Sequence, residues 1–292
     1  MTSVVQRINQ IKQPYGGYLR PSSFKTIQFQ DESCLNKTEN IHPTLIGLVV
    51  DYLTRFMISK DATSAFQISL IGAKVAQTYF NQLDAELIAV HLLQNITGLD
   101  DLSIVSSAKL VTFDVWYRNP DAALYSKSYY EVNPDAATIE NIKIMVNRSL
   151  AFWQSYGPIT SDGFTLEGGY TSLINSGDGD YLTKDTLWDF KVSKYAPTSK
   201  YTLQILIYYL MGKHSGQTIF KDINKIGIFN PRLNIAYLKN IEEIPPSTIK
   251  EVETKVIGYW PVIKIKNTFL EIIQRTSLEK CFLISFKNMT SI

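Results

Sequence analysis

The sequence has few of the residues that build disulfide frameworks and zinc sites. Among its 292 residues are two cysteines, Cys34 and Cys281, which stand near opposite ends of the chain. The three histidines have no metal-binding spacing, and no His-Glu-x-x-His motif occurs. These absences exclude a disulfide-rich scaffold and a zinc knuckle. We expect both cysteines to be ordinary thiols.

Long apolar runs and a strong net charge are also absent. No apolar run reaches the ~18 residues that cross a bilayer, and the N-terminus lacks an uninterrupted apolar signal segment. Lys and Arg number 29 against 27 Asp and Glu, a balance that neither indicates nor excludes a nucleic-acid partner. Because 45% of the residues are hydrophobic, the chain can bury a sizeable core. We expect a soluble, cytoplasmic protein that does not contact a membrane.

The spacing of apolar residues predicts a mostly helical first half. Residues 42–95 have apolar side chains at helical spacing, and one stripe includes His91, which we expect to be a core histidine. Asp100 and Asp135 are typical N-caps, the second for a helix over residues 136–153. The stripe that includes the histidine consists of Leu83, Leu87, Ile88 and Leu92.

Short segments rich in β-branched and aromatic residues follow in the second half. A helix is predicted over residues 198–211, closed by Gly212 as a left-handed cap. Another helix begins after Pro245, where Thr248 and Glu251 have the spacing of a capping box. The pattern therefore predicts an α/β (α+β) fold with a mixed β-sheet flanked by helices. The predicted strands are 164–174, 179–183, 186–193, 226–229 and 235–238.

One predicted hairpin brings acidic side chains together. If Lys184 and Asp185 form a two-residue turn, Tyr181 lies opposite Trp188, and the other opposed pairs follow from this register. Asp180 then pairs with Asp189, and Asp178 pairs with Lys191. Alternation along the strands gives one face Asp178, Asp180, Asp189 and Lys191, and the other face Gly179, Tyr181, Trp188 and Phe190.

Opposed carboxylates on such a hairpin need a positive partner. The β-carbons of directly opposed residues lie about 4.5–5.5 Å apart, so two carboxylates there repel each other. Mg²⁺ or Mn²⁺ is suitable, because such ions take oxygen ligands, keep several waters and need only one or two protein carboxylates. Lys191 adds a point charge that can hold a water or stabilise a phosphate. The alternatives are an acidic turn beside a solvated edge strand, and a calcium loop, for which the Gly and the distal Glu are missing.

Three short motifs occur in a fixed order on the two strands and the helix that follows them. They are Gly177-x-x-Asp180, Asp189-x-Lys191 and Gln204-x-x-x-Tyr208. In this order and spacing the sequence resembles the PD-(D/E)XK nuclease superfamily, specifically its RecB-like branch, over residues 163–212. The resemblance implies a restriction-endonuclease-like core at 161–260, a mostly helical part at 1–160 that packs on this core and contributes one ligand helix, and a C-terminal extension of unassigned role at 261–292.

The resemblance also implies roles for individual residues. Asp180 and Asp189 would bind the metal, the backbone carbonyl of Phe190 would complete its shell, and Lys191 would be catalytic. Gln204 and Tyr208 would line the active site near the DNA.

A third acidic ligand is expected from one of two places. Residues 47–51 are similar to the Gly-x-x-x-His pattern of an early ligand helix, with Asp51 at the ligand position. Glu167, on the first predicted strand, is the competing candidate. Gly179 occupies the place before the first acid where the superfamily usually has Pro.

The resemblance implies a Mg²⁺-dependent DNA nuclease, either an exonuclease or an endonuclease. With two cysteines the chain cannot hold the four-cysteine iron–sulfur cluster of some relatives. Because no Walker A motif occurs, ATP-driven unwinding would need a helicase or another protein partner. The alternatives are a non-catalytic nucleic-acid- or partner-binding protein that retains the nuclease fold, and an unrelated α/β protein. A basic stretch expected to follow a nucleic-acid backbone comprises Lys184, Lys191, Lys194, Lys200, Lys213, Lys221, Lys225, Arg232 and Lys239.

Overall fold

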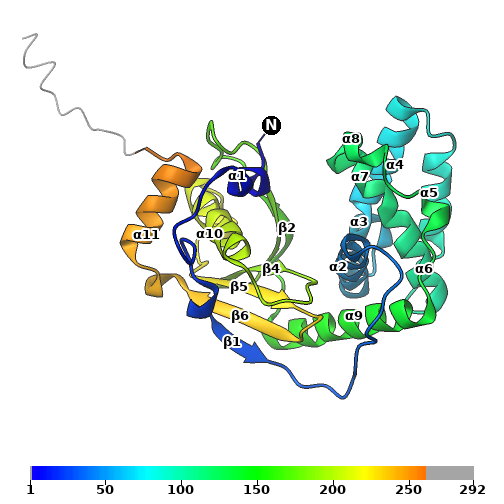
Figure 1. Ribbon diagram of the computed structural model, residues 1–292, viewed down its shortest axis with the longest axis horizontal. Coiled ribbons are helices and arrows are strands. Elements are labelled where there is room, and N and C mark those ends of the chain that lie inside the picture. Colours follow the sequence, from blue (N-terminus) through cyan, green and yellow to red (C-terminus); the bar gives the residue numbers. More distant parts are fainter. Residues whose placement is uncertain (1, 261–292) are drawn as a thin grey trace, which may run out of the picture. The chain divides into compact units, whose positions relative to one another are not determined.

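The computed structural model describes residues 2–260 of the chain (Figure 1). Residues up to Gly258 belong to one compact unit, which contains every helix and strand described below. The predicted C-terminal extension, 261–292, and Cys281 lie outside the described residues, and Cys34 is a free, exposed thiol. No helix within residues 2–260 combines the length and the apolar character needed to cross a bilayer.

Six strands form one mixed sheet in the order β1, β6, β5, β4, β3, β2. Strands β4 and β5 run parallel, and all other neighbours in the sheet are antiparallel. This confirms the predicted α/β class with a mixed sheet. The strands are β1 (Lys25–Gln28), β2 (Ser161–Thr165), β3 (Asp178–Leu182), β4 (Thr186–Phe190), β5 (Lys225–Asn230) and β6 (Ile235–Asn240).

Helices pack against the sheet and bury a central strand, β4. All five residues of β4 are buried, as expected for a strand with a parallel neighbour and packing on both faces. Helix α10 (Ser199–His214) makes the crossover between the two parallel strands and buries an apolar surface that includes Leu203 and Leu206. Helix α9 (Ala136–Tyr156) packs Phe152 and Trp153 against a second set of side chains, namely Tyr181, Trp188, Phe190, Phe229 and Ala236.

A separate apolar cluster holds the helical part together. It is formed by the first part of α9 and by α2 to α6, with Leu53, Phe66, Ile104 and Met145 among its buried members. Helix α9 therefore belongs to both clusters and runs from the helical part to the sheet (Figure 1). The other helices of this part are α2 (Pro43–Ser59), α3 (Ala62–Ala65), α4 (Gln67–Phe80), α5 (Ala85–Gln94), α6 (Asp101–Leu110), α7 (Asp114–Arg118) and α8 (Pro120–Ala123).

The remaining elements are short. Helix α1 (Val4–Gln10) contacts α10, and α11 (Pro246–Glu251) continues into a π-helix over Val252–Ile257. Because β1 also pairs with β6, the first 30 residues pack with the sheet and its crossover helix rather than with the helical part. Single 3₁₀ turns occur at Pro21–Ser23, Val111–Phe113, Tyr129–Glu131, Thr218–Phe220 and Ile241–Glu243.

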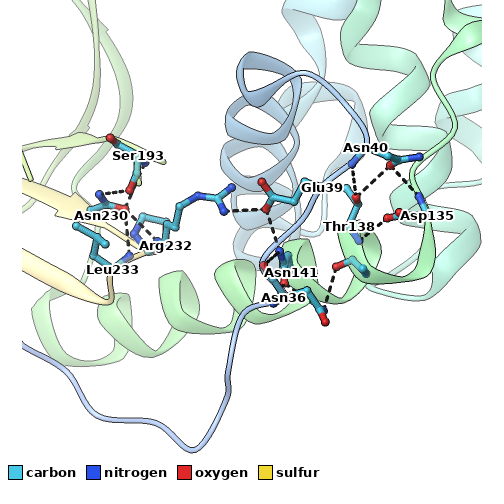
Figure 2. Close-up of polar contacts among 12 residues, drawn as sticks. Asn36, Glu39, Asn40, Asp135, Thr138, Asn141, Ser193, Asn230, Arg232 and Leu233 are labelled. Carbon is cyan, nitrogen blue, oxygen red and sulfur yellow. Dashed lines mark hydrogen bonds and ion pairs between the residues drawn. The ribbon is translucent and has the colours of Figure 1, made fainter. Parts of the chain in front are cut away.

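A buried ion pair ties the segment before α2 to the turn between β5 and β6 (Figure 2). Arg232 lies 2.8 Å from Glu39, and the two side chains are 8% and 5% exposed. Asn141 of α9 donates to the same Glu39 oxygen at 3.0 Å, and Asn40 and Thr138 form a second bond between the segment and α9. The segment before α2 is thus fixed to α9 and to the sheet by polar contacts.

Two sequence predictions about glycine-rich segments are wrong. The first strand was predicted over 164–174, but β2 ends at Thr165, and Gly168 then turns the chain with a φ of +87°. Gly212 is not a left-handed cap, because α10 continues to His214. A Cβ at Gly212 would lie 2.5 Å from the Phe220 ring, so close packing accounts for this glycine.

Two further predictions about local structure need correction, and a third is confirmed. The helix after Pro245 forms, but Thr248 lies inside it and no side chain caps it. His91 is exposed, as are Leu83 and Leu87 of its stripe, because α5 instead buries a face that includes Ala85 and Ala89. The predicted N-caps are confirmed, since Asp100 and Asp135 each accept a backbone N–H within their helix.

Candidate active site

The hairpin of β3 and β4 has the predicted register. Tyr181 lies opposite Trp188, and the Thr183 N–H donates to the Thr186 carbonyl at 2.9 Å, which closes the two-residue turn. Asp185 stabilises this turn, because its carboxylate accepts from the Thr186 hydroxyl and from Lys225, both at 2.7 Å. The tie to β5 compensates for a turn sequence that is not a favoured hairpin pair.

Beyond Tyr181 and Trp188 the two strands separate. The Phe190 N–H, which would bond to the backbone of β3 in a continuing ladder, donates instead to Asp180 Oδ2 at 2.8 Å. Strand β4 stays paired with β5, since the Lys191 N–H donates to the Phe229 carbonyl at 3.0 Å. The expected backbone pairings of Asp180 with Asp189 and of Asp178 with Lys191 are therefore both wrong. The carboxylate of Asp180 lies where the ladder opens.

Asp189, which is buried, and Asp180, which is partly exposed, form an acidic pair with Lys191 beside it. The Lys191 ammonium lies 2.8 Å from each Asp189 oxygen and donates to Oδ1. Asp189 is 2% exposed, and apart from this ion pair with Lys191 its Oδ2 has no hydrogen-bond donor among the described residues. The Oδ2 atom of Asp189 can therefore still accept a hydrogen bond or bind a cation.

Burial and mutual repulsion set the protonation of this pair. Burial, followed by the charges of Asp189 and Asp51, raises the pKa of Asp180 to about 7. Burial also raises the pKa of Asp189, against the opposing effect of Lys191. For Lys191 burial acts to lower the pKa, but the charges of Asp189 and Asp180 outweigh it and raise the pKa.

Asp51 reaches this pair from the helical part. The Tyr181 hydroxyl donates to Asp51 Oδ1 at 2.7 Å, and Arg55 Nε, one turn along α2, donates to the same oxygen at 3.1 Å. The charge of Asp51 contributes to the raised pKa of both Asp180 and Asp189, so it faces the acidic pair. The helix predicted to contribute an acid to the site does bring one near it.

Glu167 does not join these acids. It lies in the turn after β2 rather than on a strand, and its side chain is exposed. Its backbone carbonyl accepts from Gln217, which fixes the turn at a different place on the molecule. Its charge is not among those that shift the pKa of Asp180 or Asp189. The competing proposal for a third acid is therefore wrong.

Gln204 and Tyr208 lie on α10 beside the acids. The Gln204 amide donates to the Tyr208 hydroxyl at 2.8 Å, and the two residues are 8% and 5% exposed. Burial raises the pKa of Tyr208, and the charges of Asp189 and Asp180 raise it further. The helix motif and the two strand motifs thus lie within electrostatic reach of one another.

Sequence reasoning missed Arg55, which links three elements at the edge of the site. Its guanidinium forms an ion pair with Asp162 of β2, and its Cζ lies 4.4 Å from the centre of the Tyr181 ring. The spacing of Asp51 and Arg55, four residues apart on a predicted helix, is a signal that indicates such a pair.

The basic stretch is only partly available to an anion. Lys225 pairs with Asp185, Arg232 with Glu39 and Lys239 with Glu243. Lys213 donates to two backbone carbonyls. These four residues thus have partners within the protein, and the expectation that the stretch follows a nucleic-acid backbone, with part of it only a solvated face, stays a prediction.

The site has two carboxylates that fit a hard cation, not three. Within residues 2–260, no three His, Cys, Asp or Glu side chains gather closely enough to hold a metal ion. Asp51 is close to the pair but accepts from Tyr181 and Arg55. Asp180 and the buried Oδ2 of Asp189, which contacts Lys191 but keeps a further lone pair, still fit Mg²⁺, which binds through one or two carboxylates and keeps its waters. In a strand the Phe190 carbonyl points to the same side as its N–H, toward Asp180.

Comparison with known proteins assigns no family to this chain. No protein-family model matches it, and no curated protein and no solved structure matches it either. The functional interpretation therefore depends on the residues of the site and their geometry.

Proposed function

We propose that the protein is a Mg²⁺-dependent deoxyribonuclease of the RecB-like type, with a restriction-endonuclease-like core, that hydrolyses phosphodiester bonds. The observation that carries this proposal is the buried Asp189 oxygen whose only cationic neighbour among the described residues is Lys191, beside a second carboxylate whose pKa is raised to about 7. Two neighbouring buried carboxylates destabilise a fold unless a cation or a proton compensates them. Carboxylates whose pKa is raised in this way are typical of functional sites.

Each residue of the site has a role in this reaction. Asp180 and Asp189 would hold the cation together with the Phe190 carbonyl. When bound, such an ion polarises a phosphoryl oxygen and makes a bound water more acidic. The Lys191 ammonium, held by Asp189, offers its remaining hydrogens to a phosphate oxygen and stabilises the negative charge that develops there.

The helix residues orient the substrate in this proposal. The Gln204–Tyr208 hydrogen bond fixes two polar groups on α10 beside the acids, where they can bind the DNA next to the scissile phosphate. Action in the cytoplasm, and a helicase or other protein partner for duplex DNA, remain part of the proposal.

A cleavage assay with matched variants tests the proposal. Linear single- and double-stranded DNA is incubated with the protein and Mg²⁺ or Mn²⁺, and with EDTA as the blank. We expect cleavage by the wild type and its loss in Asp180→Asn, Asp189→Asn and Lys191→Met. Asn at 180 keeps an oxygen for the Phe190 N–H, so this variant should fold. The control is Asp185→Asn, at the turn of the same hairpin, which should retain cleavage. The proposal would be excluded if the wild-type protein cleaved neither single- nor double-stranded DNA, or if the variants at positions 180, 189 and 191 cleaved DNA as well as the wild type.

The alternative function is non-catalytic nucleic-acid binding by a retained nuclease fold. One observation favours it, because Lys191 already compensates the charge of Asp189 and Asp51 is engaged by two donors. Salt-sensitive DNA binding that is unchanged by Mg²⁺ and by Asp189→Asn, without cleavage, would support this alternative.

A further inference from the structure

The helical part contains a cavity of about 770 Å³. It lies between the start of α2, helices α7 and α8, and residues 126–132. Its wall is largely apolar, with Leu45, Val115 and Val132 among the lining residues. Its volume is typical of sites that hold a small organic molecule.

Two cations, Arg118 and Lys127, line this cavity and keep donors for a ligand, whereas its two acids are engaged by neighbouring residues. Two acids line it, but Asp114 accepts from the Tyr52 hydroxyl at 2.6 Å and from Ser69, and Glu131 accepts from the Ser128 N–H at 2.8 Å. Lys127 also lines it and forms no ion pair with any residue that the structure describes. An anionic group on a ligand is therefore favoured.

Arg118 connects the cavity with the candidate active site. It lines the cavity, and its Nε lies 3.8 Å from the buried Asp114 carboxylate. Its Nη1 lies 4.0 Å from Asp178 on β3, and Asp178 stands two residues before Asp180. Both separations exceed hydrogen-bond length, so the guanidinium is held between two carboxylates and keeps N–H donors for a ligand.

We propose that this cavity binds an unpaired nucleotide of the DNA strand that is cut in the neighbouring site. The base and sugar occupy the apolar wall, and the adjoining phosphate contacts Arg118 and Lys127. Tyr125, which lines the cavity and is 90% exposed, supplies an aromatic face on which a base can stack. Because only an unstacked base can enter, the substrate class is single-stranded DNA or a frayed end. This inference rests on the proposed function.

Binding without cleavage tests the inference. The full-length protein is titrated in EDTA with a fluorescent single-stranded oligothymidylate, with the same strand in a duplex, and with thymidine monophosphate as competitor. We expect tighter binding of the single strand, and a loss of at least about fivefold in Tyr125→Ala and Lys127→Ala, which change exposed side chains. Leu45→Trp, which fills the cavity, should lose more, and Tyr79→Ala, another exposed tyrosine (76% exposed) outside the cavity, should bind normally.

Each outcome decides a separate question. Wild-type affinity in folded Tyr125→Ala and Lys127→Ala overturns the inference, even if the protein cleaves DNA. Cavity-dependent binding of the single strand without any cleavage supports the nucleotide site in the cavity, but it excludes the proposed function and therefore the assignment to a cut strand. If the cavity variants weaken binding of the monophosphate but not of the oligonucleotide, the cavity binds free nucleotides. In that case the assignment to the cut strand is overturned.

Discussion

The hydroxyl of Tyr181 on β3 donates to the carboxylate of Asp51 on α2 at 2.7 Å, across 130 positions of sequence. This bond joins the sheet to the helical part at the place where the two candidate ligands lie. Arg55 supports it from both sides, because it donates to Asp51 and stacks over the Tyr181 ring. Asp51 is thereby oriented toward the acidic pair before any cation is present.

Replacing Asp51 tests whether it completes the metal site. In Asp51→Asn the amide oxygen can still accept from Tyr181, so the fold should persist. The pKa of Asp180 should fall below about 7, because the Asp51 charge is one of the causes that raise it. If Asp51 turns to the cation when it binds, Mg²⁺ affinity should fall by about tenfold or more. Carboxyl NMR titration and calorimetry measure the two effects. Asp61→Asn, which keeps its helix cap, is the control, and unchanged Mg²⁺ affinity in Asp51→Asn would rule out a ligand role.

Without divalent cations, the protein should lose stability as the pH rises from about 4 to about 7. Burial and the charge of Asp189 raise the pKa of Asp180 from 3.8 to about 7, so in this range the folded state holds a proton that the unfolded chain has lost. The contribution is fully present below the unfolded pKa and disappears above the folded one. Each pKa unit corresponds to about 1.4 kcal/mol, so the loss amounts to a few kcal/mol.

Urea unfolding in EDTA across this pH range measures the effect. Asp180→Asn cannot ionise and should flatten this part of the profile. Asp185→Asn should leave it unchanged, since hydrogen bonds from Lys225 and Thr186 outweigh burial and lower the pKa of Asp185. A wild-type profile parallel to that of Asp180→Asn would contradict the prediction.

Gly179 should not tolerate a side chain. A Cβ at this position would lie 2.0 Å from Cζ of Phe164, on the neighbouring strand β2. Gly179→Ala should therefore lower the free energy of unfolding by about 1–3 kcal/mol or more. The double variant with Phe164→Leu should recover part of this loss, as a double-mutant cycle of chemical denaturation would reveal. Equal losses with and without Phe164→Leu would show that this contact is not the cause.

Breaking the Arg232–Glu39 pair should be costly. Both side chains are nearly buried, so Arg232→Met leaves Glu39 as an uncompensated charge that only Asn141 contacts. We expect a loss of about 3–5 kcal/mol in the free energy of unfolding, measured by urea denaturation. Lys255→Met is the matched control, because its pair with Glu251 is exposed at 65% and 42% and should contribute little to stability. Similar losses in both variants would contradict the argument.

The hairpin could be predicted because its determinants are local. The turn at Lys184 and Asp185 sets the register, and alternation then places Asp180 and Asp189 on one face. The separation of β3 and β4 beyond Tyr181 could not be predicted. It occurs because the Phe190 N–H donates its hydrogen bond to the Asp180 carboxylate instead of to the backbone of β3. Strand β1 was missed because its partner, β6, lies about 200 residues further along the chain.

Other features depend on packing that spacing does not reveal. Gly212 matched a helix end by its position, yet the Phe220 ring is what excludes a side chain there. The stripe with His91 matched a buried face by its period, but the neighbouring helices cover the side with Ala89. The spacing of Arg118 and Asp114, four residues apart, is a local signal, but the second partner of Arg118, Asp178 of β3, has none.

Helix α9 gives both apolar clusters a common element. Ile142 and Met145 belong to the cluster of the helical part, and Phe152 and Trp153 belong to the cluster under the sheet. Neither cluster can melt without exposing a face of this helix, so the two parts should unfold as one cooperative unit. The same coupling opposes a hinge between them, because bending α9 would disturb the packing on both sides. Because α9 fixes the helical part, which contains Asp51, to the sheet, which contains Asp180, the distance between these two carboxylates should stay constant.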